Sequence, residues 1–180
     1  MLKISIIGVE STGKSMLTEQ LASYFHAPFV KEYARDYLEV NGSPYEYEDF
    51  INISHGQAQR EDKAVQNHKD EKYLFLDTDV LVLKIWADVV YGKNESWLDE
   101  RLNNELADLY LLLSPDIPWV DDGMREYPDL NERERINELY INLLNDLSCN
   151  YSLISGSEYS DRFDQAVSSI KRFSDLVLGG

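Results

Sequence analysis

The chain has 180 residues, of which 43% are hydrophobic and 28% are charged, and its formal net charge at pH 7 is −16. This length suits a single domain over residues 1–180, and the composition is that of a globular protein, which excludes a disordered chain. The negative charge argues against nucleic acid or an anionic membrane as a partner, because long-range repulsion opposes both.

The location of the protein is suggested by what the sequence lacks. No apolar run reaches the roughly 20 residues that span a bilayer, and the opening segment MLKISII leads into a strand instead of a signal-peptide core. The single cysteine, Cys149, cannot form an internal disulfide, which fits a reducing compartment. We therefore expect a cytoplasmic protein.

The first expected elements are a strand, a glycine-rich turn and a helix. Residues 4–7 form an apolar run without alternation, typical of a strand buried on both faces of a parallel sheet. A helix is predicted over 14–25, where apolar side chains recur at helical spacing before Pro28. The next expected elements are a short strand at 28–32, a helix at 31–40 and a loop at 41–44.

The rest of the chain continues this alternation. The expected elements are a helix at 47–70, a strand at 72–79, helices at 80–92 and 96–106, a strand at 108–114, a loop, a helix at 131–147, a strand at 151–155 and a helix at 160–177. Strands that alternate with helices predict an α/β fold, in which a five-stranded parallel sheet is sandwiched by helices. Ligands of such sheets bind beyond the carboxyl ends of the strands.

The segment GVESTGKS, residues 8–15, fits the pattern G-x-x-x-x-G-K-[S/T] of a phosphate-binding loop. Its glycines let backbone N–H groups surround a phosphate, Lys14 adds a positive charge, and Ser15 offers a hydroxyl to Mg²⁺. The buried strand before it and the amphipathic helix after it are the context that such a loop requires. We predict ATP binding with Mg²⁺, with GTP left open, in contact with Gly8, Glu10, Ser11, Thr12, Gly13, Lys14, Ser15 and Met16.

Two further observations narrow the class of P-loop NTPase. A base-reading N-K-x-D-like sequence of GTPases is missing, and the third strand ends in LDTD instead of the Asp-Glu pair of ring-forming ATPases. A compact nucleoside or nucleotide kinase remains. Such kinases neutralise the transferring phosphoryl group with arginines on a lid, which we expect at about residues 119–135. Arg125 is its main candidate, and Arg133 and Arg135 follow.

The adenine site is expected beyond the fifth strand. The sequence SGSEYSDRF occupies the position where many P-loop kinases enclose the base. There Gly156 permits a close approach, and Arg162 is available for stacking on the ring.

Four segments together resemble the nicotinamide riboside kinase domain of NadR-type proteins: IGVESTGKSMLTEQLA, PFVKEYARDYLE, FLDTDVLVLKIWADVVYG and SPDIPWVDDGMREYPDLNERERI. KEYAR and DIPWVDDGxR carry most of this resemblance, because they are not general features of kinases. It implies a phosphotransferase that uses ATP to phosphorylate the 5′-hydroxyl of nicotinamide riboside, giving NMN and ADP in NAD salvage. An NMN adenylyltransferase domain often precedes this domain in the family, and a kinase that stands alone would leave adenylylation to another protein.

Carboxylates at strand ends are the candidate general bases. Asp77 follows the third strand and is placed either to take the hydroxyl proton or to hold Mg²⁺, and Glu32 after the second strand is its rival. Asp79 is expected to cap the following helix. The predicted catalytic residues are Lys14, Glu32, Asp77 and Arg125, and the predicted metal site contains Ser15 and Asp77.

A pocket for nicotinamide riboside should offer aromatic faces and carboxylates, because the pyridinium ring of this nucleoside is a cation. Trp119 is the first aromatic candidate, whereas Trp86 lies inside a predicted helix and is expected in the core. Gln57 is a candidate to bind ribose hydroxyls or a carboxamide. The predicted substrate-binding residues are Tyr33, Tyr37, Gln57, Trp119, Asp121 and Asp122.

The three histidines are not expected to form a metal site. His26, His55 and His68 share no spacing that suggests a metal site, so surface positions are expected for them.

Two alternatives to a nicotinamide riboside kinase stay open: a kinase for another nucleoside or a nucleotide, and a regulator that binds ATP without turnover. In each case the expected partner is a small molecule.

Overall fold

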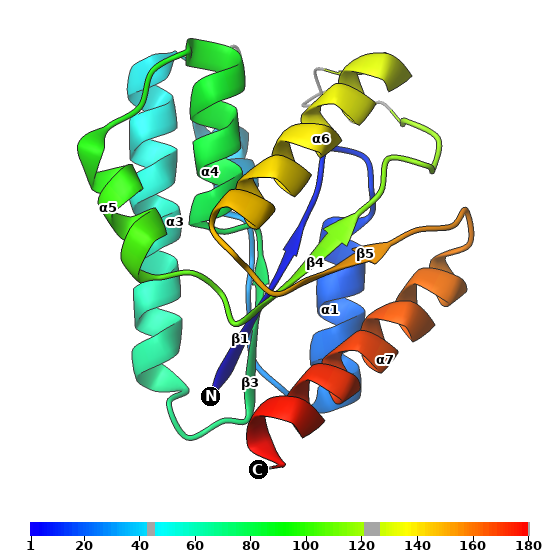
Figure 1. Ribbon diagram of the computed structural model, residues 1–180. Coiled ribbons are helices and arrows are strands. Elements are labelled where there is room, and N and C mark those ends of the chain that lie inside the picture. Colours follow the sequence, from blue (N-terminus) through cyan, green and yellow to red (C-terminus); the bar gives the residue numbers. More distant parts are fainter. Residues whose placement is uncertain (43–45, 121–126, 180) are drawn as a thin grey trace.

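The structure, a computed structural model, describes residues 1–42, 46–120 and 127–179, and its centre is a five-stranded parallel sheet (Figure 1). The strand order is β2-β3-β1-β4-β5. The predicted α/β fold with a parallel sheet is therefore confirmed. The strands are β1 (Leu2–Ile7), β2 (Phe29–Val30), β3 (Tyr73–Asp77), β4 (Leu109–Leu113) and β5 (Tyr151–Ile154).

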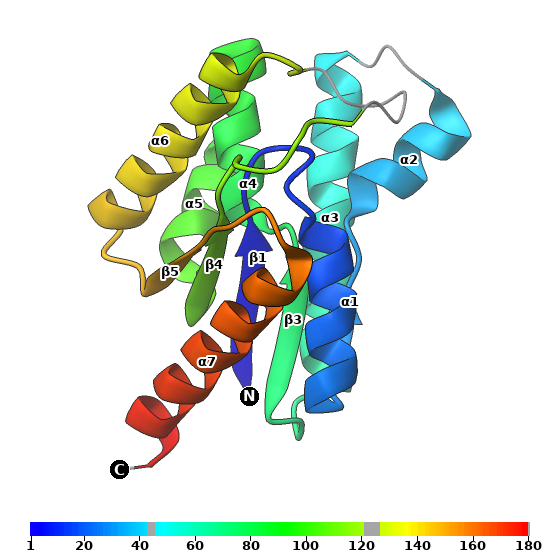
Figure 2. The same cartoon turned by 90° about the vertical axis from the view of Figure 1, so that its right-hand side faces the viewer.

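Helices cover both faces of the sheet (Figures 1 and 2). One face is covered by α1 (Lys14–Phe25) and α7 (Tyr159–Leu178), and the other by α3 (Tyr47–Asn67), α4 (Val80–Trp86), α5 (Ser96–Asn104) and α6 (Leu130–Asp146). The helix α2 (Tyr33–Asn41) packs against α3. Across the described ranges, no helical segment combines the length and the apolar character that a bilayer crossing requires.

The strand β4 is buried on both faces, which explains its unbroken apolar sequence. In β4, Tyr110 and Leu112 pack with α4 and α6, whereas Leu109, Leu111 and Leu113 pack with α1 and α7. Every residue of β4 is at most 3% exposed. A strand in this position needs apolar side chains at consecutive positions, as the run LYLLL provides.

Two segments differ from the expectation. The predicted helix 80–92 is α4 followed by a π-helical turn over Ala87–Tyr91, which ends at Gly92 with φ 60°. The predicted lid, about 119–135, overlaps α6, which begins at Leu130 because the Asp129 carboxylate accepts a hydrogen bond from the Glu132 N–H at 3.0 Å. Residues 130–135 are thus part of a packed helix, and Asp121, Asp122 and Arg125 lie outside the described residues.

Candidate functional site

The phosphate-loop sequence connects β1 to α1 at the carboxyl end of the sheet (Figure 2). Gly8 has φ 142°, and a Cβ atom there would lie 2.7 Å from the carbonyl oxygen of Leu113. Gly13 has φ 86° and lies beneath the ring of Tyr159, which a Cβ atom would approach to 2.9 Å. Only glycine satisfies both the conformation and the space at these two positions, which explains the glycine spacing of the motif.

The loop leads directly into α1, whose first residue is Lys14. The N-cap of this helix, Gly13, provides no side-chain hydrogen bond, which leaves the first N–H groups for an anion. The Lys14 ammonium donates to the carbonyl oxygen of Val9 at 3.0 Å, and the Thr12 hydroxyl donates to the same oxygen at 2.8 Å. The loop is therefore folded around its own lysine, in the form that a phosphate-binding loop requires.

Two buried arginines brace this loop from α6 and α7. Arg162 is 1% exposed and donates to the carbonyl oxygens of Thr12 at 3.1 Å and Ser114 at 2.9 Å. It also donates to the carbonyl oxygen of Gly156 at 2.6 Å and pairs with Asp116. Arg133 is 2% exposed and donates to the carbonyl oxygens of Ser11 and Ile117, each at 3.4 Å.

These positions correct two expectations. Arg162 was expected to stack on adenine, but its guanidinium is enclosed by the acceptors that it binds, so it positions the phosphate loop instead. Arg133 was expected on a lid, but it lies in the buried face of α6. Arg135 is exposed and pairs with Glu132 at 3.0 Å. Gly156 has φ 109° and donates its N–H to Asp116 at 2.7 Å.

A cavity of about 820 Å³ opens beside the phosphate loop. Every predicted nucleotide-contacting residue of the loop, from Gly8 to Met16, lines it. Both candidate bases, Glu32 and Asp77, line it as well. The cavity therefore joins a phosphate cradle to a second compartment that contains carboxylates. Its other polar and aromatic lining side chains include Arg35, Trp86, Tyr127, Tyr140 and Tyr159.

Asp77 ends β3 and is 4% exposed. Burial raises the pKa of its carboxyl, whereas a hydrogen bond with Ser15 and the charges of Lys14 and Arg35 oppose this rise. Its Oδ1 atom has no hydrogen-bond partner among the described residues. A buried carboxylate oxygen without a partner, next to the Ser15 hydroxyl, fits an oxygen-ligand site for Mg²⁺.

The other carboxylates near β3 and β2 have separate surroundings. Glu32 precedes α2 and faces the same cavity as Asp77. Asp79 is 1% exposed, and its carboxylate accepts a hydrogen bond from the Leu81 N–H at 3.1 Å, which confirms the predicted helix cap. Burial, followed by the charges of Asp79 and Glu32, raises the pKa of Tyr140, so its hydroxyl stays protonated on the cavity wall.

An aromatic wall, formed by Trp86 and Tyr127, faces the cavity. The two ring centroids are 5.6 Å apart, and the planes are inclined by 51°. Trp86 was expected in the core. It packs against the buried core residues on this face of the sheet, as expected, and its partly buried side chain also lines the cavity. The cavity is also lined by Val82, Ile85 and Val89, from the same helical face as Trp86. Core residues of a helix recur at the same spacing, so periodicity alone did not distinguish a core position from a cavity wall.

The other predicted substrate-binding residues lie elsewhere. Trp119 donates its indole N–H to Glu10 at 3.1 Å, the Tyr37 hydroxyl donates to Asp49 at 2.7 Å, and the Tyr33 ring lies 4.8 Å from the Arg60 guanidinium. None of these three side chains lines the cavity that the described residues form. Their roles in binding substrate stay predictions.

Gln57 is also predicted to bind substrate, and the structure gives its amide three protein partners. Its oxygen accepts from the Tyr33 N–H at 2.8 Å, and its nitrogen donates to Glu61 at 2.9 Å and to the Thr78 carbonyl at 3.2 Å. It is 1% exposed and borders a smaller cavity of about 60 Å³ next to the first. These contacts show that Gln57 joins α2, α3 and the end of β3.

Comparisons with known proteins agree with this geometry. The sequence pattern of the family described as AAA domain matches residues 3–162. The chain is 28% identical over 172 residues to the trifunctional NAD biosynthesis/regulator protein NadR of Escherichia coli (strain K12), with 93% of this chain and 42% of that protein covered. The chain thus spans less than half the length of this relative.

Solved structures show the same fold. Crystal structures of a NadR protein, one in complex with NR and one with NAD and AMP-PNP, superpose with TM-scores of 0.77 and 0.79 at 22% identity, covering 96% of this chain and 49% of that one. A deoxyadenosine kinase from M. mycoides superposes with a TM-score of 0.67 at 14% identity and covers 95% of this chain and 100% of its own. The fold is therefore that of P-loop kinases.

Proposed function

This chain belongs to the AAA domain family, and we propose that within it the chain is an ATP-dependent nicotinamide riboside kinase. The enzyme transfers a phosphoryl group from ATP to the 5′-hydroxyl of nicotinamide riboside and releases NMN and ADP. The observation that carries this proposal is that the phosphate loop, two carboxylates and an aromatic wall line the same cavity of about 820 Å³.

The donor half of the proposed site is the phosphate loop. The backbone N–H groups at the start of α1 bind the phosphates of ATP, and Lys14 exchanges the Val9 carbonyl for a phosphate oxygen. The Ser15 hydroxyl and Asp77 would hold Mg²⁺, which when bound neutralises charge on the phosphates. Arg125, which lies outside the described residues, is proposed to add positive charge to the transferring group.

The acceptor half is the compartment next to Glu32 and Asp77. One of these carboxylates accepts the proton of the 5′-hydroxyl as the hydroxyl oxygen attacks the terminal phosphorus. The pyridinium ring lies against the wall of Trp86 and Tyr127, because aromatic faces attract a cation. Carboxylates on the same cavity strengthen this preference for a positively charged nucleoside.

The comparisons support the same acceptor. NadR of E. coli is named a NAD biosynthesis protein, and a NadR protein of the same fold has been solved with NR. A second candidate is a kinase that acts on a different nucleoside, which the fold of the deoxyadenosine kinase favours. The two are separated by kcat/KM for a panel of nucleosides, in which nicotinamide riboside should be preferred.

The test is direct. Purified protein with Mg-ATP and nicotinamide riboside should form NMN and ADP in equal amounts, and Lys14→Ala should lower kcat by at least about 100-fold. Lys63→Ala, which changes an exposed lysine on α3, is the matched control and should keep the wild-type rate. Tight binding of Mg-ATP by a folded protein that phosphorylates no acceptor would instead identify a nucleotide-sensing regulator.

A further inference from the structure

Glu10, inside the phosphate loop, binds two residues that lie between β4 and α6 in the sequence. Its Oε1 atom accepts a hydrogen bond from the indole N–H of Trp119 at 3.1 Å. The same oxygen accepts a hydrogen bond from the backbone N–H of Tyr127. One carboxylate of the donor loop therefore holds two points that are distant from it in the sequence.

One of these two points is part of the aromatic wall. The centroid of the Tyr127 ring lies 5.6 Å from that of the Trp86 ring, and both rings are on the cavity surface. Because the N–H belongs to the same residue as the ring, the contact with Glu10 fixes the base of that side chain. The distance from the phosphate loop to the aromatic wall is thus set by Glu10.

The neighbouring residue Ser11 reinforces this connection. Its hydroxyl accepts a hydrogen bond from the Val120 N–H at 3.0 Å, next to Trp119 in the sequence. Its carbonyl oxygen accepts from Arg133, whose helix α6 also contributes Ile136 and Tyr140 to the cavity wall. Donor loop and acceptor wall are therefore joined by several contacts, of which only those of Glu10 involve an acidic side chain of the loop.

We propose that Glu10 is a positioning residue for acceptor recognition, which holds Tyr127 of the aromatic wall against the phosphate loop. This inference rests on the proposed function, since it assigns the acceptor to the aromatic wall. Hydrogen bonds to a carboxylate are stronger than those to a neutral oxygen, so the contact suits this task.

The experiment compares Glu10→Ala, which removes the contact, with Glu10→Gln, which keeps an acceptor oxygen without the charge. Glu134→Gln, an exposed position of α6 outside the cavity, is the matched control. For Glu10→Ala we expect the KM for nicotinamide riboside to rise about tenfold while the KM for ATP changes less than about threefold. Glu10→Gln should lie between this variant and the wild type, and the control should match the wild type.

A measurement that needs no turnover accompanies the kinetics. Hydrogen exchange of the Tyr127 amide in the unliganded protein should be faster by about tenfold in Glu10→Ala and less so in Glu10→Gln, because the amide loses its acceptor. Unchanged exchange in Glu10→Ala would overturn the inference, and so would equal increases of both KM values. If the wild-type protein forms no NMN, the proposed function fails, and the exchange of the Tyr127 amide alone decides on the anchoring by Glu10: an unchanged exchange rate in Glu10→Ala overturns it.

Discussion

Arg162, on α7, donates a hydrogen bond to the carbonyl oxygen of Thr12, in the phosphate loop, at 3.1 Å. The adjacent carbonyl, that of Ser11, is bound by Arg133 from α6. When consecutive carbonyl groups of a loop are bound from behind, the N–H groups of the loop are left for a ligand on the other side. Two arginines that are far apart in the sequence therefore maintain the shape on which phosphate binding depends.

Replacement of Arg162 tests this bracing. Arg162→Ala leaves the carbonyl oxygens of Thr12, Ser114 and Gly156 without this donor, and we expect the free energy of unfolding to fall by about 2–4 kcal/mol. Urea unfolding measures this change. The KM for ATP should rise as well, because the loop loses its support.

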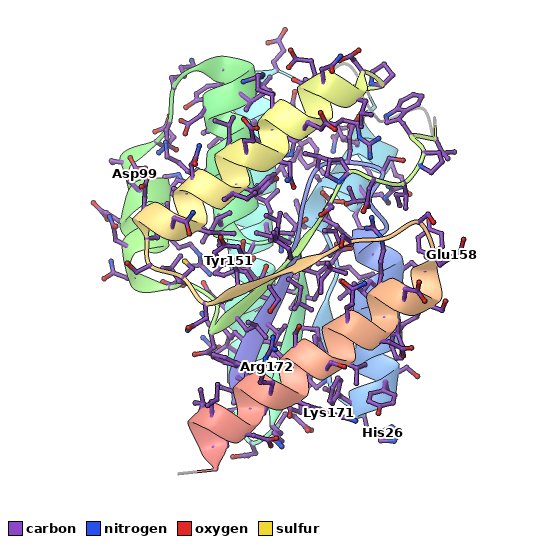
Figure 3. All side chains as sticks on the ribbon, turned by 45° about the vertical axis from the view of Figure 1, so that its right-hand side comes forward. His26, Asp99, Tyr151, Glu158, Lys171 and Arg172 are labelled. Carbon is purple, nitrogen blue, oxygen red and sulfur yellow. The ribbon has the colours of Figure 1, made fainter. Side chains whose placement is uncertain are left out.

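The control for this variant lies on the same helix. Arg172 is exposed on α7, and Figure 3 shows it farther along that helix, so Arg172→Ala should change the stability by less than about 0.5 kcal/mol. Arg162→Lys should recover little, because an ammonium cannot reach acceptors spread around a planar guanidinium. Wild-type stability in Arg162→Ala would contradict the bracing role.

Asp77→Asn should abolish turnover and stabilise the fold. The pKa of Asp77 is raised by burial, so the stabilisation that comes from its protonated form is present at low pH and is lost as the pH rises above the ordinary value. A buried carboxyl group with a raised pKa therefore costs stability at a pH above its ordinary value, and an asparagine removes that cost. We expect a higher Tm at pH 7, measured by differential scanning fluorimetry, together with a loss of at least about 100-fold in kcat.

Asp70→Asn, at an exposed position after α3, is the control for Asp77→Asn and should alter neither value. A lower Tm in Asp77→Asn would show that the carboxylate supports the fold. Partial recovery of the rate at high Mg²⁺ concentration would assign Asp77 to the metal and leave the role of base to Glu32.

Glu61 makes the stability of the fold depend on pH. It is 7% exposed, and burial, followed by the charge of Asp79, raises its pKa to about 8 against the opposing effects of Gln57 and Arg101. The folded protein thus holds a proton that the unfolded chain releases near 4.5, and the stability contributed by this proton is lost as the pH rises from about 4.5 to about 8.

We therefore expect Glu61→Gln to have a Tm that exceeds the wild-type Tm by an amount that grows up to about pH 8 and then stays constant. Thermal melts at a series of pH values measure this difference. Glu100→Gln changes an exposed position of α5, and its Tm difference from the wild type should not grow with pH up to about pH 8. The same constant difference in both variants would contradict the raised pKa.

The sequence was sufficient to predict the sheet and the position of the phosphate-loop sequence between β1 and α1. Gly8 and Gly13 have positive φ angles, and Lys14 binds the Val9 carbonyl within the same eight residues, so these local requirements are visible in the motif itself. The unbroken apolar run of β4 likewise has one explanation, burial on both faces.

The acceptor half was less accessible from the sequence, because it depends on which residues meet across the fold. A helical apolar stripe such as that of Trp86 has the same periodicity whether it faces a core or a cavity. Arginines present a similar difficulty: Arg133 and Arg162 looked like ligands for phosphate or base, but they bind carbonyl groups that only the tertiary structure brings to them.

The tryptophan proposed to recognise the acceptor is the last residue to be tested. The sequence favours Trp119, but in the structure Trp86 lines the cavity and Trp119 binds Glu10. Trp86→Ala should raise the KM for nicotinamide riboside by about 10- to 30-fold with little change in the KM for ATP, because a desolvated cation–π contact is worth up to about 2 kcal/mol. Trp119→Phe keeps an aromatic ring and should change the acceptor KM by less than about threefold. Steady-state kinetics with each substrate varied in turn gives all four values, and an equal effect of both variants on the acceptor KM would return Trp119 to the binding site.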